Sequence, residues 1–514
     1  MTVDDALRTA PSTDEAGGSA VPTGRSTTAA PREVATGGAP WTGPAAAPTG
    51  QPGAAGAGAG WRARAVLWVV CAAVFMANLD LFIVNIAFPD IQRDLGGGLS
   101  TLSWVLNGYA IVFAALLVPA GRLADRHGHR GGFLLGTVLF TAASALCAAS
   151  PGVGSLVVGR VVQAAGAAVL LPTSLALLLA VTPAEGRAAA VRGWAAVGGL
   201  AAALGPVVGG LLVELDWRWV FLVNLPVGVA TLVLGARVLP RRREENPGPL
   251  PDAAGVLALT AGIGLLALGL VKSSDWGWGS AEVVGSLVGA SVLLAGFVAR
   301  SMRHPSPVVE FSLLRTPGFS PAAVALFLFC IAFAAMLLSL VTYMAGAWNW
   351  SALRIGLAVT PGPAMVPPVA LLLAGPLIAR FGLWRTAGTG ALIYAVGAAW
   401  WALRVGQHAD YAADVLPGML LTGIGVGLVM PTLTAGATAV LPPDRLATGS
   451  AVVSMARQVA SVLGVAILVA IVGSPAPQRF VHAFHEGWWF VAATSLAASV
   501  TAFVGLRPRR AALA

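Results

Sequence analysis

This 514-residue chain contains few charged residues: Asp, Glu, Lys and Arg together make up only 10% of it. Soluble globular domains carry about 25% charged residues, so this composition excludes an ordinary soluble fold. Of the 31 basic residues only Lys272 is a lysine. Because the arginines lie in short segments between apolar runs, the net charge of +9 indicates membrane topology and not nucleic-acid binding.

Cysteines and nucleotide-binding motifs are also scarce. The three cysteines, Cys71, Cys147 and Cys330, lie in apolar runs, and their spacing fits no metal site. No GxxxxGK[ST] stretch occurs, which excludes ATP-driven pumping by this chain alone. His127 and His129 stand alone in an arginine-rich loop, and His482 and His485 share a loop with Glu486 only, where metal binding is the less favoured alternative. We therefore expect no catalytic residues, no metal and no cofactor.

Long hydrophobic runs dominate the chain instead. Hydrophobic residues make up 57% of the sequence, and the mean hydropathy is +0.80. Apolar runs of about 20 residues, the length that crosses a bilayer as a helix, recur along it. They predict an all-α polytopic membrane protein with fourteen spans. The predicted spans are 65–88, 103–121, 131–149, 155–180, 188–213, 218–239, 253–271, 281–300, 319–345, 354–378, 384–403, 412–436, 447–472 and 486–506.

The spans fall into a six, two and six arrangement. The loop GRLADRHGHR before span three has a degraded echo, ARFGLWR, before span eleven, as parallel internal repeats would leave. The residues before the first span are rich in Ala, Gly, Pro, Ser and Thr without any helical period. The predicted parts are a disordered cytoplasmic tail (1–60), an amino-terminal six-helix bundle (61–240), two linker transmembrane helices (241–305) and a carboxy-terminal six-helix bundle (306–514).

Loop charges predict the orientation. If the amino terminus is cytoplasmic, the inner flanks of the spans carry twenty arginines, against six basic residues on the outer flanks. This bias follows the positive-inside rule and places both termini in the cytoplasm. The Ala, Gly and Arg bias suggests a GC-rich bacterial genome, so we expect a multi-pass monomer in the bacterial cytoplasmic membrane.

The first span contains an intramembrane acid, Asp80. An acid inside hydrocarbon is costly and indicates function. Helical spacing places Asp80 on a stripe of small residues, with Asn78 and Asn85 on roughly the opposite face. One of these two faces, that of Asp80 or that of the asparagines, is expected to line a cavity, and the other to contact a neighbouring helix. The alternative is an acid that merely hydrogen-bonds a neighbour.

Span four supplies a base at the same depth. Arg160 lies near the outer end of span four, which runs inward. Counting residues from the ends of spans one and four places Arg160 at the depth of Asp80. Gln163 shares the helical face of Arg160. Burial and a nearby arginine act in opposite directions on the proton affinity of a carboxyl group. Movement of Arg160 would therefore change proton binding at Asp80. The alternative is a static ion pair that only fixes helix packing.

Two further features indicate moving parts. Span five carries Gly205-Pro206 and Gly209-Gly210, where proline bends a helix and glycine permits close approach of another. The loop before span three carries Gly121, Asp125, Arg126, Gly128 and Arg130. We expect Asp125 to pair with arginines of a neighbouring loop as a latch on the cytoplasmic side, and the weakness of such exposed pairs suits a contact that must break.

These stretches resemble signatures of the major facilitator superfamily, in order along the chain. The first span resembles LDxTIVNVALP, and the loop before span three resembles GxLADRxGRK, with His129 in place of an arginine. Span four resembles RxxQGxGAA with Ala164 in place of a glycine, and span five resembles GxxxGPxxGG with Ala201 in place of a glycine. Span thirteen, with Arg457 and Gln458, resembles SxxRQLGGALGVA of fourteen-helix drug:proton antiporters. The resemblance implies two six-helix bundles plus two extra helices, and proton-coupled efflux of a small lipophilic substrate.

The resemblance also implies site roles. Asp80 and Arg160 would couple protons, and Asn78, Asn85, Gln163, Arg457 and Gln458 are candidates for the substrate path. No acid lies deep in a carboxy-half span, which argues against dicationic substrates. The alternatives are a proton symporter that imports a metabolite, which the Gly-Pro span disfavours, and a polytopic membrane enzyme or receptor.

Overall fold

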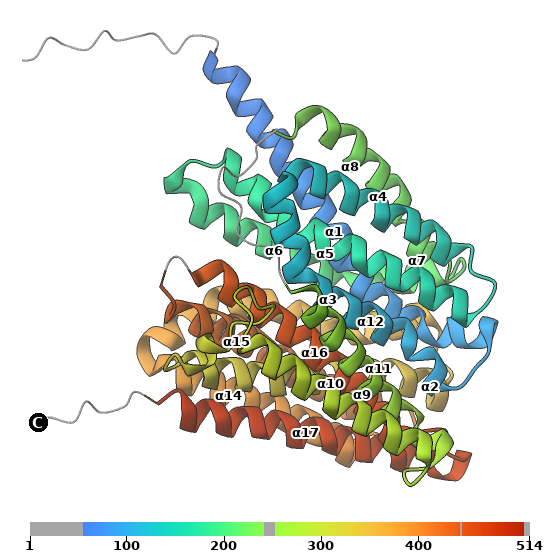
Figure 1. The fold of residues 1–514 in the computed structure, drawn as a ribbon. Coiled ribbons are helices and arrows are strands. Elements are labelled where there is room, and N and C mark those ends of the chain that lie inside the picture. Colours follow the sequence, from blue (N-terminus) through green and yellow to red (C-terminus); the bar gives the residue numbers. More distant parts are fainter. Residues whose placement is uncertain (1–54, 241–251, 443–444, 508–514) are drawn as a thin grey trace, which may run out of the picture. The chain divides into compact units, whose positions relative to one another are not determined.

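Helices joined by short turns make up nearly all of the described chain (Figure 1). The computed structural model describes residues 55–240, 252–442 and 445–507, and no strand occurs in these ranges. The amino-terminal helices are α1 (Ala55–Leu95), α2 (Leu99–Leu102), α3 (Trp104–His127), α4 (His129–Ala148), α5 (Val153–Val181), α6 (Arg187–Val213), α7 (Trp219–Leu222) and α8 (Asn224–Val238). A middle pair follows, α9 (Ala253–Trp276) and α10 (Ala281–Ser301).

The carboxy-terminal helices are α11 (Phe319–Trp348), α12 (Ala352–Val359), α13 (Pro361–Pro368), α14 (Gly375–Arg404), α15 (Leu416–Ala439), α16 (Leu446–Val472) and α17 (Phe480–Gly505). Short 3₁₀ turns, η1 (Ala184–Gly186), η2 (Phe311–Arg315) and η6 (Pro477–Arg479), and π-helical segments, η3 (Val369–Ala374) and η4 (Tyr411–Val415), lie between them. Because α1 begins at Ala55, residues 55–60 of the predicted tail are helical. Residues 1–54 lie outside the described part.

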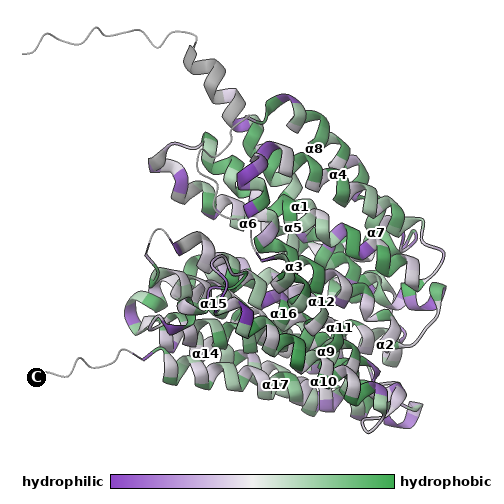
Figure 2. Cartoon of the chain, in the orientation of Figure 1, coloured by the Kyte–Doolittle hydropathy of each residue, from purple (hydrophilic) through white to green (hydrophobic). Residues whose placement is uncertain are grey.

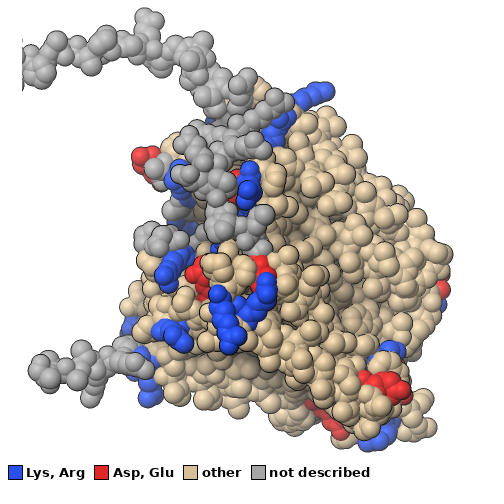
Figure 3. Space-filling view, in the orientation of Figure 1, with Lys and Arg blue, Asp and Glu red and all other residues tan. Residues whose placement is uncertain are grey.

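Thirteen of the described helical stretches are long and apolar enough to cross a membrane. Figure 2 shows hydrophobic residues along these helices and hydrophilic ones mainly near their ends. In the face drawn in Figure 3, charged side chains gather toward the two ends of the helices, with a wide uncharged expanse between them. This distribution fits a protein whose middle lies in hydrocarbon, as the composition predicts.

The difference between thirteen and fourteen spans comes from one stretch, Ala352–Arg404, which runs for 53 residues. A continuous helix of that length would measure about 80 Å, far more than a hydrocarbon core of about 30 Å. The backbone is not helical at Gly382, where φ is +79° and ψ is 163°. Such a positive φ suits glycine, and it marks a turn inside the stretch.

Contacts at both ends of the part that follows the turn show that the chain reverses at Gly382. Just after the turn, the Trp384 ring lies 5.2 Å from the guanidinium of Arg507, which follows the end of α17. Beyond Arg404, the carbonyl oxygen of Gly406 accepts hydrogen bonds of 2.9 Å from Tyr343 and from Trp348, near the end of α11. The reversal supports spans ten and eleven as separate crossings, and the count of fourteen stays a prediction.

The side at which α1 begins and α17 ends is called the terminal side, and the opposite one the far side. The amino-terminal and carboxy-terminal helices meet mainly where α3 packs against α16 and where α6 packs against α12 and α13. The predicted division into bundles at residues 61–240, 241–305 and 306–514 remains a prediction.

The middle pair of helices covers one of these seams. The helix α9 packs against α10 and also against both α3 and α16. Asp252 caps α9 and accepts two hydrogen bonds from Arg300 at the end of α10, one of them 2.8 Å long. Hydrogen bonding from the Arg300 guanidinium holds the pKa of Asp252 below its usual value. This ion pair therefore ties the terminal-side ends of the two extra helices together.

Candidate functional site

Asp80 lies in the middle of α1 and is completely buried. On the same helical face lie Ala73, Ala77, Val84 and Ala87, each no more than 1% exposed. The stripe of small residues therefore packs against other helices, and it carries the acid with it into a region without solvent contact. An isolated carboxylate there would be very unfavourable, so its partners decide what it can do.

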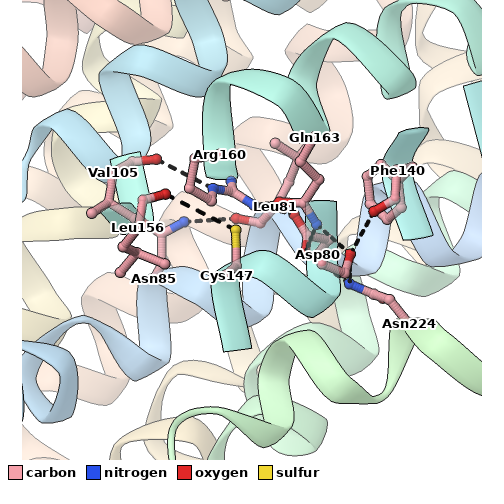
Figure 4. Close-up of polar contacts among 11 residues, drawn as sticks. Asp80, Leu81, Asn85, Val105, Phe140, Cys147, Leu156, Arg160, Gln163 and Asn224 are labelled. Atoms are coloured by element: carbon pink, nitrogen blue, oxygen red, sulfur yellow. Dashed lines mark hydrogen bonds and ion pairs between the residues drawn. The ribbon is translucent and has the colours of Figure 1, made fainter. Parts of the chain in front are cut away.

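Arg160 of α5 is the main partner of this acid (Figure 4). Its Nη1 forms an ion pair with Oδ2 of Asp80 and also donates to Oε1 of Gln163 at 2.6 Å. Its Nε donates to the carbonyl oxygen of Val105 in α3 at 3.3 Å. Gln163 in turn donates through Nε2 to Oδ1 of Asp80 at 2.9 Å. The structure thus joins the acid and the base that the sequence placed at one depth.

Two members of this cluster were missed from the sequence. Asn224, at the start of α8, donates through Nδ2 to Oδ1 of Asp80 at 3.0 Å. The hydroxyl of Ser144 in α4 accepts from Gln163 at 2.8 Å and from Asn224 at 3.3 Å. Asp80, Arg160, Gln163, Asn224 and Ser144 are each no more than 1% exposed, and we call them the Asp80 network.

Close packing of three helices assembles the network. A Cβ atom at Gly166 of α5 would lie 2.6 Å from the backbone nitrogen of Phe140 in α4, and one at Gly228 of α8 would lie 2.0 Å from the hydroxyl oxygen of Thr141. Real Cβ atoms essentially never come within 3.0 Å of such neighbours. Glycine at these two positions therefore lets α5 and α8 press against α4, which carries Ser144.

Aromatic rings enclose the guanidinium of Arg160. Its Cζ lies 4.2 Å from the ring centroid of Tyr109 in α3 and 5.9 Å from that of Phe221 in α7. Cation–π attraction of this kind is stronger where water is excluded. Asp80 accepts hydrogen bonds from Arg160, Gln163 and Asn224, and of these three Arg160 alone carries a charge.

The two asparagines of α1 do not join the network. Asn78 and Asn85 are half-buried, and each donates at 2.8 Å to a backbone carbonyl four residues earlier in the same helix. A Cβ at Gly198 of α6 would lie 3.6 Å from Nδ2 of Asn78. Asn78 therefore faces α6, on a different side of α1 from Asp80, as helical spacing predicts.

The glycines of α6 bring this helix against α1. A Cβ at Gly205 would lie 2.5 Å from Cβ of Phe82, and one at Gly209 would lie 3.1 Å from Cα of Ile83. Both contacts lie within the amino-terminal set of helices. They hold α6 beside the segment of α1 that carries Asp80, so movement of α6 bears directly on the region of the acid.

The same helix also approaches the carboxy-terminal set of helices closely. A Cβ at Gly210 would lie 2.8 Å from Cα of Leu353 in α12, and a Cβ at Gly356 of α12 would lie only 2.2 Å from the carbonyl oxygen of Pro206. The contact is therefore backbone against backbone. It lies near the far-side end of α6, so the two sets are closed against each other there.

The loop between α3 and α4 lies on the terminal side. Gly128 has φ of +103°, a conformation that suits glycine and makes the tight turn. Asp125 lies 3.6 Å from Nε2 of His129 in the same loop. Arg130 donates to the carbonyl oxygen of Ala236 in α8. Gly121 lies in the last part of α3, Arg126 is exposed, and the latch role of these residues remains a prediction.

Arg457 and Gln458 lie in the middle of α16, in the carboxy-terminal set, and the structure does not bring them to Asp80. Arg457 is exposed and Gln458 is half-buried. Among residues 55–240, 252–442 and 445–507, no group of three or more His, Cys, Asp or Glu side chains could hold a metal ion.

Comparison with known proteins assigns the family. The model of the Major Facilitator Superfamily matches residues 70–465 and, in a second match, 322–513. This chain belongs to that superfamily. Its all-helical fold of membrane-spanning length is the fold expected of a member.

Several curated members of the superfamily are similar over most of this chain. A probable actinorhodin transporter of Streptomyces coelicolor is 34% identical, over 79% of this chain and 72% of its own length. A tetracenomycin C resistance and export protein of Streptomyces glaucescens is 32% identical, over 82% and 77% respectively. A puromycin resistance protein of Streptomyces alboniger is 36% identical, over 78% and 80%.

Solved structures of the superfamily share the fold at low identity. A peptide transporter in complex with sulfate gives a TM-score of 0.63 at 16% identity, covering 85% of this chain and 93% of that one. A human organic anion transporter gives 0.59 at 15% identity, covering 86% and 99%. At such identities the likeness concerns the arrangement of helices alone.

Proposed function

We propose that this member of the superfamily is a proton-coupled exporter of small lipophilic compounds, with Asp80 as the proton carrier and Arg160 as its modulator. The observation that carries the proposal is the fully buried ion pair between them, inside the Asp80 network. Buried ion pairs contribute little net stability. An acid that only fixed packing would be better replaced by an apolar residue, whereas an acid that exchanges a proton must be kept.

The proposed cycle has two states. In the first, the ion pair between Asp80 and Arg160 is formed and Asp80 is taken to hold no proton. In the second, Arg160 moves away from Asp80, the buried acid loses its counter-charge, and it takes up a proton. A substrate that favours one arrangement of the helices then favours one of these two protonation states, which is coupling in the thermodynamic sense.

The helix α6 supplies the change of access in this proposal. Its contact with α12 closes the far side, and separation of the two would open that side. On the terminal side, the loop from Gly121 to Arg130 would hold the opposite opening shut when the far side opens. With the terminal side in the cytoplasm, as the arginine bias indicates, the structure corresponds to the state closed toward the outside.

The proton gradient can drive the export that this cycle performs. One elementary charge that crosses 100 mV of membrane potential yields about 2.3 kcal/mol. One proton crossing about 150 mV would therefore support a substrate gradient of about 300-fold, since every 1.4 kcal/mol is tenfold. One titrating acid is thus enough for an effective exporter.

Relatives support export over import. Those at 32–36% identity are named as transporters, resistance proteins or export proteins of antibiotics. We extend this to the present chain as efflux of a lipophilic antibiotic or drug across the bacterial cytoplasmic membrane, by a monomer with both termini in the cytoplasm. Its partners are the substrate, protons and the bilayer, without a cofactor, nucleic acid or enzymatic step.

The test uses everted membrane vesicles with an acid lumen and a pH-sensitive dye. Three fluorescent probes are added in turn: neutral N-phenyl-1-naphthylamine, anionic 8-anilinonaphthalene-1-sulfonate and cationic ethidium. We expect at least one probe to release protons from the lumen of vesicles that hold the wild type. Asp80→Asn should abolish that release while the protein remains inserted in equal amount.

A second acid of α1 provides the matched control. Asp94 lies near the far-side end of the helix, is half-exposed, and accepts a hydrogen bond from Trp217. Asp94→Asn should keep most of the proton release, because this acid lies outside the Asp80 network. Full release by Asp80→Asn, or equal loss in both variants, would remove the proton-carrier role from Asp80.

A further inference from the structure

Arg457 is a charged side chain exposed in the middle of a membrane-spanning helix. It lies about 17 Å from the start of α16 and about 23 Å from its end, at 1.5 Å per residue. A charge at that depth is very unfavourable in contact with lipid, and such residues face a bundle interior or a water-filled path. The exposure of Arg457 therefore marks a place where water reaches the middle of the protein.

The face of α16 that carries Arg457 is polar over several turns. Ser450, Ser454, Arg457 and Ser461 follow one another at spacings of four, three and four residues, which is one helical face. Ser450 and Arg457 are exposed, and the other two are half-buried. We call these four residues the α16 polar stripe, and it begins near the terminal side.

The stripe ends before the far side. Continuing along the same face, Val465, Leu468 and Val472 are apolar, and each is 6% exposed or less. A lipid-facing surface would be apolar where it is exposed, but here the exposed part is polar and the apolar part is covered. The pattern fits a path that is open toward the terminal side and closed toward the far side, like the contact of α6 with α12.

Arg457 also points toward buried polar groups of neighbouring helices. It lies beside the thiol of Cys330 in α11. On the same helix, Ser339 accepts a hydrogen bond of 3.1 Å from Trp488 of α17. Cys330 and Ser339 are nine residues apart, so their side chains point to opposite faces of α11. Arg457 therefore lies on the side of α11 away from the peripheral helix α17.

An unpartnered hydroxyl lies in the same region. Tyr394 of α14 is fully buried, its ring centroid lies 4.9 Å from that of Phe329, the neighbour of Cys330 in α11, and its hydroxyl has no hydrogen-bond partner. Buried polar groups without a partner are rare in native proteins. A ligand or its water shell that reaches past Arg457 would supply the missing partner.

Arg457 has no opposite charge to balance it. Among the described residues it forms no ion pair, since the acid of the Asp80 network is already bound to Arg160. The sequence contains no Asp or Glu between Glu310 and Asp410, nor between residues 445 and 485. The middle of the carboxy-terminal helices is therefore electropositive.

We infer that Arg457 and the α16 polar stripe form an anion subsite in the substrate path, so that the exported compounds are lipophilic anions. The arginine would bind a carboxylate, sulfonate or phenolate group, the serines would donate to it, and the surrounding apolar side chains would bury the rest of the molecule. This inference rests on the proposed function, because it names the substrate class of that export path.

Binding of two matched dyes tests the subsite without a proton gradient. 8-Anilinonaphthalene-1-sulfonate and N-phenyl-1-naphthylamine share one aromatic skeleton and differ by the sulfonate. Their affinities are measured by fluorescence for the full chain in nanodiscs of zwitterionic lipid, with empty nanodiscs subtracted. The wild type should bind the anion more tightly than the neutral dye. Arg457→Gln should weaken binding of the anion about tenfold, or about 1.4 kcal/mol, and change neutral-dye binding less than about twofold.

Two further variants separate charge from structure. Arg457→Lys keeps the charge and should retain most of the preference for the anion. Arg380→Gln removes another exposed arginine, outside the α16 polar stripe, and should change neither affinity. A wild type without preference for the anion, or an Arg457→Gln variant that affects both dyes equally or neither, overturns the subsite. Since no proton flux is measured, that outcome is distinct from failure of the Asp80→Asn test.

Discussion

Filling the space at Gly356 should open the far side of the molecule. A methyl group there would lie 2.2 Å from the carbonyl oxygen of Pro206, whereas an ordinary contact needs about 3.4 Å or more, so α6 and α12 must separate by more than about 1 Å. The carbonyl belongs to backbone and cannot turn aside as a side-chain end could. Gly210→Ala acts on the same contact from the other helix, where the methyl group would lie 2.8 Å from Cα of Leu353.

The size of the effect follows from the cost of overpacking. Adding a methyl group to a well-packed contact costs about 1–3 kcal/mol. The cost arises only while the far side is closed, because the contact exists only in that arrangement. The equilibrium between the closed and open far side should therefore move toward the open one by about 5- to 150-fold.

Distance measurement between spin labels checks this shift. Leu215→Cys and Ser351→Cys place labels at exposed positions near the far-side ends of α6 and α12. In the background of either Gly356→Ala or Gly210→Ala, pulsed electron resonance should show a larger fraction of long distances between the labels. Export should fall at the same time, because the cycle then spends less time open toward the terminal side.

Two glycines of α6 serve as controls. Gly199 has no neighbour within 4 Å of an added Cβ, so Gly199→Ala should leave the distances unchanged. Gly205 meets Phe82 within the same set of helices, so Gly205→Ala should reduce stability without lengthening the distances. If Gly356→Ala leaves the distribution unchanged, or if Gly205→Ala lengthens it equally, the contact of α6 with α12 does not control access.

Two further predictions concern the ion pairs. Asp80→Asn should lower the free energy of unfolding of the purified protein by about 3–5 kcal/mol, because Arg160 is left buried without its partner. Adding Arg160→Gln should recover most of that loss in a double-mutant cycle of denaturant unfolding. Additive effects of the two substitutions would contradict this. Hydrogen bonding from Arg300 holds the pKa of Asp252 in the folded protein below its usual value. The ion pair therefore stabilises the fold fully at pH values above the ordinary pKa of about 3.9. This stabilisation is lost as the pH falls through the lower pKa of the folded protein. Asp252→Asn should therefore lower Tm at pH 7 but not near pH 2, and an equal loss at both pH values would argue against the ion pair.

The depth of the main pair was predictable because helix rise is constant. Counting residues from the ends of two apolar runs placed Asp80 and Arg160 at one level, and the structure joins them. Asn224 and Ser144 were missed, since an uncharged amide or hydroxyl within an apolar run is too common to mark a site. Only the packing of α5 and α8 on α4 shows that these two side chains reach the same carboxylate.

Other features depend on contacts that the sequence does not reveal. The Gly-Pro stretch predicts a bent, closely packed helix, but not that Pro206 lies against Gly356 of a helix some 150 residues later. A neighbouring loop was expected to hold Asp125; His129 of its own loop lies 3.6 Å away, and the latch stays a prediction. Spans ten and eleven were predicted at 354–378 and 384–403, and the backbone turns between these ranges at Gly382, although the helices are nearly continuous across it.

The most direct test of the account measures proton release on binding. Purified protein in a weakly buffered solution with a soluble pH indicator is mixed with whichever of the three probes it transports. The account predicts that the probe releases protons from the wild type and from Asp94→Asn, and that Asp80→Asn binds the probe without releasing them. Equal release from Asp80→Asn would show that another group carries the proton.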